Sequence, residues 1–414
     1  MDYKIIRKIF FDLFKIDKID YPESKVLTIA HDNDRSYLYH NQYYSPLMDT
    51  IEDDLFKITG EKCVSIARII STIKGDISYG NVYSPEGSFA RAMVIKRVKQ
   101  FFKRDVYPYS KIEERIWKKI LLKTKAKKVL AIMPSRELCS ICRKMNIWVA
   151  DVQHGVIAHE HPWYGASYRK NEPKEYLPNA FLVWDYGSAE VMNWTTDKGA
   201  DNIVIGNRWL RRFTIKDKND SLVNESINKI EKENTLSKEK KTILVSLSWG
   251  CVGIENSIIP ESLINIIEKT KDKYNWLLRL HPNQIKGFAT HESKVFFKIY
   301  NEKLKNNSVW EFPTHNTLPV VLSITDLHIA WNTSVAIEAA QLGIKTCMLD
   351  PMLRKGRVVD YYFYYHKKGF IDYILDDELK IGEWIDKNIK TKSSSENYKV
   401  FDDNYENLLS FLNE

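Results

Sequence analysis

The chain has 414 residues, 44% of them hydrophobic and 28% charged, enough for two or three domains with buried cores. No run approaches the ~20 apolar residues that cross a bilayer, and none follows the basic N-terminus, so we expect neither a transmembrane helix nor a signal peptide. Five scattered cysteines argue against a disulfide scaffold and favour the reducing cytoplasm.

The first elements along the chain are basic or amphipathic helices. Apolar residues recur at helical steps in residues 1–20, so this helix either packs on its own domain or lies on a membrane surface. Residues 91–128 hold 14 Lys or Arg against three acids, a local net charge of +11 in a chain of +8. This segment predicts helices at 89–104 and 110–125 that either form a solvated face or meet an anionic partner. No nucleic-acid-binding motif accompanies it, so we expect no nucleic-acid partner.

Short apolar runs alternate with helices in two series. The first series predicts strands at 25–30, 62–67, 129–135, 147–155, 180–185 and 202–206. The second predicts strands at 242–250, 275–282, 308–312, 326–331 and 345–350, with helices near 261–272, 317–324 and 333–343. Apolar strands separated by helices form parallel sheets that are covered on both faces. The fold class is therefore α/β, with two Rossmann-like doubly wound domains.

The domain boundaries follow from the polar segment between the two series. Residues 214–241 are rich in Lys, Asn, Glu and Ser, which predicts a linker with room for one exposed helix. We expect an acceptor-side domain at 1–213, a nucleotide-donor domain at 242–384, and C-terminal helices at 385–414 that either stay there or return to the first domain. The default active site is a cleft between the two domains.

Polar residues follow three strands of the second series, where such sheets bind ligands. Arg279 and His281 in RLHP suit a phosphate, and the imidazole can donate to a leaving phosphate or protonate it. The helix start at 332–334 offers hydroxyl and N–H groups to an anion. The expected donor-nucleotide residues are Arg279, His281, Thr333, Ser334, Glu338, Ser248, Gly250 and Asn332. Each group also has a structural interpretation as a helix cap, a strand end or a tight turn.

The segment DVQHGVIAHEHPWYG (151–165) is the densest polar cluster of the first series. An inverting transfer needs a base for the acceptor hydroxyl, and we expect His154 in this role, oriented by Asp151. Gln153, His159 and His161 are the expected acceptor-binding residues. A metal site made from the three histidines is the alternative, but their spacing matches no helical ligand pair, so no metal is expected.

Three further patterns have two interpretations each. HDNDR (31–35) contains a DxD, which reads as a metal site or as a polar turn, and Asp32 is kept as a backup base. The CxxC pair at Cys139 and Cys142 is typical of helix packing, with redox or metal chemistry as the alternative. The run YYFYY (361–365) either stacks on sugar rings or packs inside the protein.

QHG, RLHP and NTSVAIEAAQLGIKTCMLDP, in this order, resemble GT-B transferases of bacterial surface polysaccharides, such as capsule Kdo transferases, bacterial polysialyltransferases and CDP-glycerol glycerophosphotransferases. In those groups a His–Pro pair and a Ser/Thr-rich helix start bind the nucleotide phosphates, which implies His281–Pro282 and Thr333–Ser334 here. The resemblance covers about residues 129–351. It implies a CMP- or CDP-linked donor and no divalent metal. The EDG-like triplet of polysialyltransferases is missing, so UDP-, GDP- and dTDP-sugars stay open as donors.

The sequence thus predicts an inverting glycosyltransferase that moves a sugar, from a CMP-linked donor by preference, to a bacterial surface polysaccharide or glycolipid such as capsule or O-antigen. We expect no cofactor beyond the nucleotide-sugar co-substrate. The expected location is the cytoplasm, peripheral at the inner face of the cytoplasmic membrane through residues 1–20 and 91–128, near a lipid-linked acceptor. The alternatives are a polyol-phosphate transferase, a nucleotide-sugar 2-epimerase and a non-catalytic glycan- or membrane-binding protein.

Overall fold

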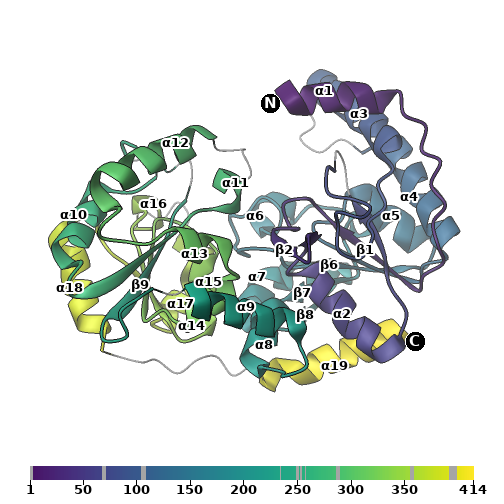
Figure 1. Ribbon diagram of the computed structural model, residues 1–414. Helices are drawn as coiled ribbons and strands as arrows, with labels where there is room; N and C mark the ends of the chain where they lie inside the picture. The colour runs from purple at the N-terminus through teal and green to yellow at the C-terminus, as the bar shows by residue number, and fades with distance from the viewer. Residues whose placement is uncertain are drawn as a thin grey trace. The chain divides into compact units, whose positions relative to one another are not determined.

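The computed structural model describes residues 3–67, 71–103, 109–233, 235–248, 251, 254–256, 258–285, 290–354, 359–390 and 399–414. Within them the chain separates into two compact units, which can be followed by colour in Figure 1. The N-terminal unit contains Met1–Ile157, His161–Trp209 and Lys399–Glu414, and the C-terminal unit contains Ala158–Glu160 and Leu210–Tyr398. The chain leaves the first unit inside helix α8 (Arg208–Ile215).

A six-stranded parallel sheet lies at the centre of the N-terminal unit, in the order β4-β1-β5-β6-β7-β8. Each of its strands overlaps a predicted one. An antiparallel hairpin of β2 and β3, which was not predicted, follows β1. The strands are β1 (Val26–Ala30), β2 (Tyr37–Tyr39), β3 (Gln42–Tyr44), β4 (Val64–Ala67), β5 (Lys128–Ala131), β6 (Trp148–Val152), β7 (Ala180–Val183) and β8 (Asp201–Val204).

Helices cover both faces of this sheet because alternate strand residues point to opposite sides. Leu27 and Val129 pack with α4 and α5, whereas Val26 and Leu130 pack with α2 and the C-terminal helix α19. The CxxC pair lies buried in α5 as free thiols, in agreement with a packing role. The helices are α1 (Tyr3–Leu13), α2 (Met48–Thr59), α3 (Glu86–Lys103), α4 (Lys111–Thr124), α5 (Arg136–Lys144), α6 (Ala166–Arg169), η1 (Lys174–Tyr176), α7 (Tyr186–Met192), η2 (Asn193–Lys198) and α19 (Lys399–Asn413).

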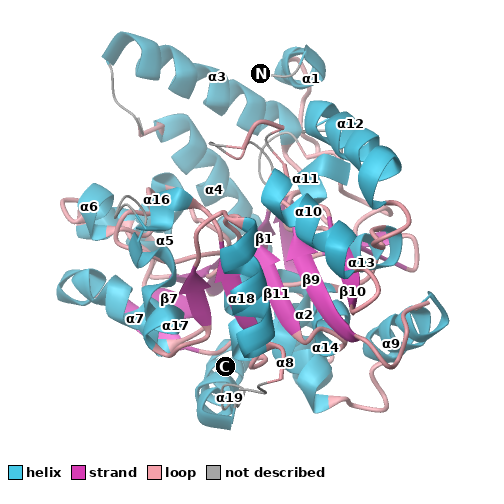
Figure 2. Cartoon of the chain, turned by 90° about the vertical axis from the view of Figure 1, so that its left-hand side faces the viewer, coloured by secondary structure: helices cyan, strands magenta, loops and turns pink. Residues whose placement is uncertain are grey.

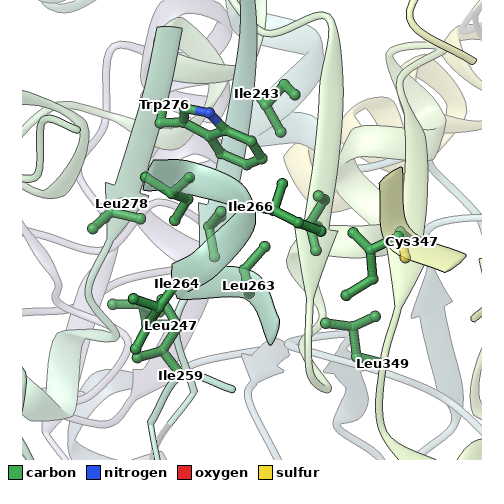
Figure 3. Packing of buried hydrophobic residues seen from close by; sticks show 14 of the residues in the cluster. Ile243, Leu247, Ile259, Leu263, Ile264, Ile266, Trp276, Leu278, Cys347 and Leu349 are labelled. Carbon is green, nitrogen blue, oxygen red and sulfur yellow. The ribbon is translucent and has the colours of Figure 1, made fainter. Parts of the chain in front are cut away.

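The C-terminal unit contains a second parallel sheet, in the order β10-β9-β11-β12-β13. Its strands are β9 (Lys241–Ser246), β10 (Tyr274–Arg279), β11 (Leu327–Ala330), β12 (Lys345–Met348) and β13 (Ile371–Tyr373). Figure 3 shows the core on one face, where Leu263 and Ile266 of α10 approach Trp276 and Ile243 of the sheet. Figure 2 shows the strands of this sheet in magenta with α18 in front of them. Both sheets are doubly wound, as predicted.

The other helices of this unit range from 3-10 and α-helices of four residues to the 13 residues of α9. They are α9 (Ser221–Glu233), α10 (Glu261–Thr270), α11 (Pro282–Ile285), α12 (Thr290–Ile299), the π-helix η3 (Tyr300–Leu304), α13 (Glu311–His315), α14 (Leu318–Ser323), α15 (Val335–Gln341), α16 (Pro351–Arg354), η4 (Val359–Tyr362), α17 (Phe363–Lys367) and α18 (Glu378–Asn388). None of the helices in the described ranges is both long and apolar enough to cross a membrane.

Two local predictions were wrong. Residues 308–312 form no strand: Val309 makes one bridge to Leu277, and α13 starts at Glu311. Pro313 has no N–H, so it cannot extend a ladder beyond that bridge. The predicted linker 214–241 contains one helix, α9, as expected, but this helix is not wholly exposed, because Leu222 and Ile230 are buried and it contacts α14.

Candidate functional site

Three loops of the C-terminal unit leave the sheet at the same level. Ser246 at the end of β9 pairs with Arg279 of β10 on one side and Ala330 of β11 on the other. Because the strands are parallel and in register, Ser248, His281 and Asn332 all follow at the carboxyl edge, where ligands bind in such sheets.

Direct hydrogen bonds join these three loops. The Ser248 hydroxyl donates to the carbonyl oxygen of Asn332 at 2.8 Å. The Gln284 side chain accepts from the backbone N–H of His281 at 2.7 Å and donates to the carbonyl oxygen of Ser248 at 3.5 Å. Gln284 was missed by the sequence analysis, although it lies two residues after the His–Pro pair. The loops therefore form one connected edge.

Arg279 lies behind this edge and holds a neighbouring loop. Its guanidinium donates to the carbonyl oxygens of Asn316, at 3.0 Å, and Pro313. Burial lowers the pKa of Arg279 to about 10, against the opposing effect of Glu338, so the group stays a cation near neutral pH. Arg279 thus anchors the C-terminal end of α13 and supplies positive charge close to Glu338.

His281 is half-buried beside this cation. Burial first, and then the charge of Arg279, lower the pKa of His281 below its usual value of 6.5. The imidazole is therefore neutral near pH 7 in the unliganded protein. A negatively charged group placed beside it would favour the protonated form.

The polar residues in the turn from β11 into α15 differ in whether their side chains are bonded within the protein. Asn332, a predicted donor-binding residue, donates to Asp350 at 3.1 Å and accepts from the Tyr362 hydroxyl at 2.6 Å, so its side chain is already held by the protein. Thr333 accepts from the backbone N–H of Val335 at 3.3 Å. Ser334 makes no side-chain cap bond and is half-buried, as is Glu338. Gly250, also expected here, lies outside the described residues.

The YYFYY run lies partly under this edge. Tyr362 and Tyr365 are buried, and Tyr365 accepts from Gln341 at 3.0 Å, whereas Phe363 is exposed. The packing interpretation therefore holds for these two tyrosines. Tyr362, which fixes Asn332, is a further residue whose contact the sequence did not indicate.

His154 follows β6 in the N-terminal unit and is paired with a tyrosine. Its Nδ1 lies 2.9 Å from the hydroxyl of Tyr164, which is fully buried. Burial, together with the nearby His161, lowers the pKa of His154 to about 4. Burial also lowers the pKa of His161, whose Nδ1 accepts from the backbone N–H of Trp163 at 3.1 Å. Both imidazoles are therefore neutral near pH 7.

The described hydrogen bonds of Asp151 go to residues other than His154. Its carboxylate is buried and accepts from the backbone N–H of Met133 at 3.0 Å and from the Trp163 indole at 2.8 Å. It positions the 151–165 segment, and Tyr164 is the hydrogen-bonding partner of His154.

Gln153 is a second correction, because its amide is used inside the unit. It donates to the carbonyl oxygen of Gly155 at 2.8 Å and accepts from the backbone N–H of Trp184 at 2.7 Å, in a buried position. These contacts shape the loop after β6. His159 is exposed and is grouped with the C-terminal unit.

The DxD after β1 forms a polar turn. Asp32 accepts from the backbone N–H of Thr72 at 2.7 Å, from its hydroxyl at 2.9 Å, and from the Ser71 hydroxyl. Asp34 accepts from the backbone N–H of His31 at 2.9 Å. Asp32 therefore fastens the segment after β4, which leaves little of its carboxylate for the backup role of base. No group of three metal-ligating side chains occurs in the described parts of the chain.

No family profile and no curated protein sequence matches the chain. Solved structures do resemble it: UDP-GlcNAc 2-epimerase from Neisseria meningitidis bound to UDP-GlcNAc has a TM-score of 0.57 at 15% identity, over 94% of this chain and 99% of its own. The wall teichoic acid polymerase TagF has a TM-score of 0.58 at 13% identity, over 99% and 93%. A TagF variant soaked with CDPG has a TM-score of 0.54 at 14% identity, over 99% and 92%. These similarities establish an α/β fold of the GT-B type with two Rossmann-like domains.

Proposed function

We propose that the protein is an inverting GT-B transferase that moves a sugar from a nucleotide-activated, preferably CMP-linked, donor to a bacterial surface polysaccharide or glycolipid. The observation that supports this proposal is the connected edge of the C-terminal unit, where hydrogen bonds join the loops that carry Ser248, His281 and Asn332. The GT-B fold supports it, since solved structures of that fold include one with bound UDP-GlcNAc and one soaked with CDPG.

The edge has the chemical groups that a departing nucleotide needs. In the transfer, the bond between the sugar and the phosphate oxygen breaks, and the negative charge passes to the nucleotide phosphate. His281 would donate a hydrogen bond or a proton to that phosphate, with Arg279 as a fixed positive charge behind it. Thr333 and Ser334 would add hydroxyl contacts, and Glu338 would accept from the ribose hydroxyls. Because the protein supplies this charge itself, we expect turnover in EDTA, and loss of turnover that Mg²⁺ restores would contradict it.

His154 is the proposed base for the acceptor hydroxyl. A neutral imidazole can take a proton, and burial keeps His154 neutral. A pKa of about 4 makes a weak base, so the acceptor complex must raise it. The charge of an anionic acceptor would do so.

A second candidate is transfer of a polyol phosphate from a CDP-linked donor. The similarity to TagF over nearly the whole chain favours it. The residues proposed to bind the nucleotide phosphate would bind the phosphates of this donor in the same way. The products separate the two, because only polyol-phosphate transfer leaves a phosphodiester in the acceptor, visible by 31P NMR. Conversion of a nucleotide sugar without an acceptor would instead indicate a 2-epimerase.

The donor site is tested by titrating the protein calorimetrically with CMP, CDP, UDP and GDP. His281→Ala should weaken binding of the preferred nucleotide about tenfold or more, roughly 1.4 kcal/mol, as expected for a charge-assisted hydrogen bond. His291→Ala, in an exposed position on α12, is the matched control and should bind like wild type. If none of the four nucleotides binds, the donor site is refuted and a non-catalytic glycan-binding role gains support.

The base is tested separately from the donor site. His154→Ala should abolish turnover while donor affinity stays within about twofold of wild type. Turnover retained in this variant would exclude His154 as the base. We further propose a cytoplasmic location, where nucleotide-activated sugars are made. The five free cysteines are consistent with that compartment.

A further inference from the structure

Helix α1 has two apolar faces, and only one of them is covered. Ile9 and Leu13 are half-buried on the side that contacts α3. On the other side Phe10, Phe11 and Phe14 are 59%, 57% and 74% exposed. Phenylalanine at this exposure is unfavourable in water, and three on one helix form a patch that is typical of an interaction site.

The C-terminal half of α3 continues this pattern. Val98, Phe101 and Phe102 are 50%, 82% and 76% exposed, and the two rings pack edge to face on each other. We call Phe10, Phe11, Phe14, Val98, Phe101 and Phe102 the phenylalanine patch. It holds five of the 17 phenylalanines of the chain.

The two helices are fastened to each other, so all the rings of the patch are carried by one helix pair. Glu86 at the start of α3 pairs with Lys8 at 2.8 Å and Lys15 at 2.6 Å. The Arg91 guanidinium donates to the carbonyl oxygens of Leu13 and Lys15, each at 2.9 Å. Figures 1 and 2 both show α1 beside α3 at one end of the unit, and in Figure 2 α3 extends away from the sheet.

Gly87 allows this close approach. A Cβ at this position would lie 2.1 Å from the carbonyl oxygen of Lys15, which no side chain tolerates. Substitution of Gly87 must therefore push α1 away from α3.

The surface around the patch is basic. Together, α1 and α3 contain eight Lys or Arg and two acids, a net charge of +6. Arg7, Arg91 and Arg97 are exposed, and Arg7 lies over the Phe11 ring at 5.6 Å. The described contacts of Arg91 and Arg97 are hydrogen bonds to carbonyl and amide oxygens, not ion pairs. Their positive charge is therefore available to an anionic partner.

We propose that the phenylalanine patch docks on an anionic lipid bilayer, with its rings at the headgroup boundary and the arginines on lipid phosphates. Apolar rings beside cations are the chemistry that binds helices to the surface of a membrane. A second copy of the chain fits less well, because two surfaces of charge +6 repel each other. The inference deepens the proposed function, since a bilayer is where a lipid-linked acceptor is found.

The test is sedimentation of the full chain with vesicles of phosphatidylcholine, with and without about one third phosphatidylglycerol. Wild type should bind the anionic vesicles, and less so as salt rises. Phe101→Ser with Phe102→Ser, and Phe10→Ser with Phe14→Ser, should each lower the partition coefficient about tenfold or more. Leu375→Ser with Leu379→Ser, two exposed leucines of the C-terminal unit, is the matched control and should bind like wild type.

Two more variants separate the parts of the surface. Arg97→Gln should weaken binding to anionic vesicles only, and Gly87→Ala should weaken binding although it removes no ring or charge. The proposal would be overturned if wild type did not bind anionic vesicles, or if the phenylalanine variants bound them like wild type. So would a dimer, seen by analytical ultracentrifugation, that the phenylalanine variants dissociate. Unchanged nucleotide affinity in these variants shows a folded protein and keeps this test independent of the donor site.

Discussion

The hydroxyl of Tyr164 lies 2.9 Å from Nδ1 of His154, and this hydrogen bond decides which imidazole nitrogen can accept a proton. If the hydroxyl donates to Nδ1, the neutral ring carries its proton on Nε2 and has no free acceptor. If Nδ1–H donates to the hydroxyl oxygen, Nε2 is free to act as a base. Tyr164 therefore controls the proposed role of His154 without touching the acceptor itself.

Removing the Tyr164 hydroxyl should change the pH dependence of turnover and not only its rate. Tyr164→Phe keeps the buried ring but leaves Nδ1 without its partner, so the acidic limb of the pH–rate profile should shift. Tyr168→Phe, on the neighbouring helix α6 and exposed, is the control. A parallel pH profile at a lower rate would assign Tyr164 a purely structural role.

Nucleotide binding should be coupled to proton uptake at His281. Its pKa is lowered in the free protein, first by burial and then by Arg279, and a bound phosphate should raise it. Affinity for a donor whose phosphate is a diester, such as a CMP-linked sugar, should therefore increase as the pH falls through and below 6.5. Calorimetry in two buffers of different ionisation enthalpy measures the proton, and His281→Gln should abolish it. Equal enthalpies in both buffers for wild type would exclude the coupling.

Ser248→Ala should loosen the connection between the loops after β9 and β11. The hydroxyl donates to the carbonyl oxygen of Asn332, and its loss should lower the free energy of unfolding by about 1 kcal/mol. The substitution should also weaken nucleotide binding, because the loops after β9 and β11 are no longer held in a fixed relative position. Ser262→Ala, which removes an exposed hydrogen bond to Asp376, should change neither by more than about 0.5 kcal/mol. Urea unfolding and nucleotide titration of both variants provide the comparison.

His328 should make the fold sensitive to acid. It is completely buried between the hydroxyls of Ser246, at 2.9 Å, and Thr346, at 3.1 Å, and burial lowers its pKa to about 3. Between pH 6.5 and about 3 the unfolded chain binds a proton that the folded chain does not. The free energy of unfolding should therefore fall with the pH, by about 1.4 kcal/mol per unit from this group. His328→Gln does not titrate and should show a shallower fall in urea unfolding, and equal slopes would contradict this.

The fold could be predicted because its signals are local. Most strands of the first sheet, such as β1, β5 and β7, are buried apolar runs between helices, and such runs predict parallel pairing from local sequence alone. The wrong predictions concern segments whose structure depends on contacts with residues that are distant in the sequence. Residues 308–312 have the composition of a strand, but only Val309 bridges to the sheet, and α13 starts at Glu311. Residues 214–241 look exposed by composition, yet Leu222 and Ile230 are enough to pack α9.

The candidate site was predictable in position but not in detail. Polar residues at strand ends indicated the carboxyl edge of each sheet, which depends only on chain direction. Which of them face a ligand depends on partners that are distant in sequence. Tyr362, thirty residues further along the chain, donates a hydrogen bond to Asn332. Asp151 accepts hydrogen bonds from Trp163 and Met133. Tyr164 was overlooked because a buried tyrosine carries no sequence pattern of its own.

Helix α19 gives the protein an unusual order of assembly. Tyr405, Leu408 and Leu412 of this helix complete the core over β1, β5 and β6, which are made near the start of synthesis. During synthesis, α19 leaves the ribosome after the whole C-terminal unit. Until then, the face of the first sheet that α19 covers stays partly exposed. That unit is almost continuous in the chain and can finish first. Nascent chains stalled before Lys399 should therefore protect the second sheet from protease better than the first.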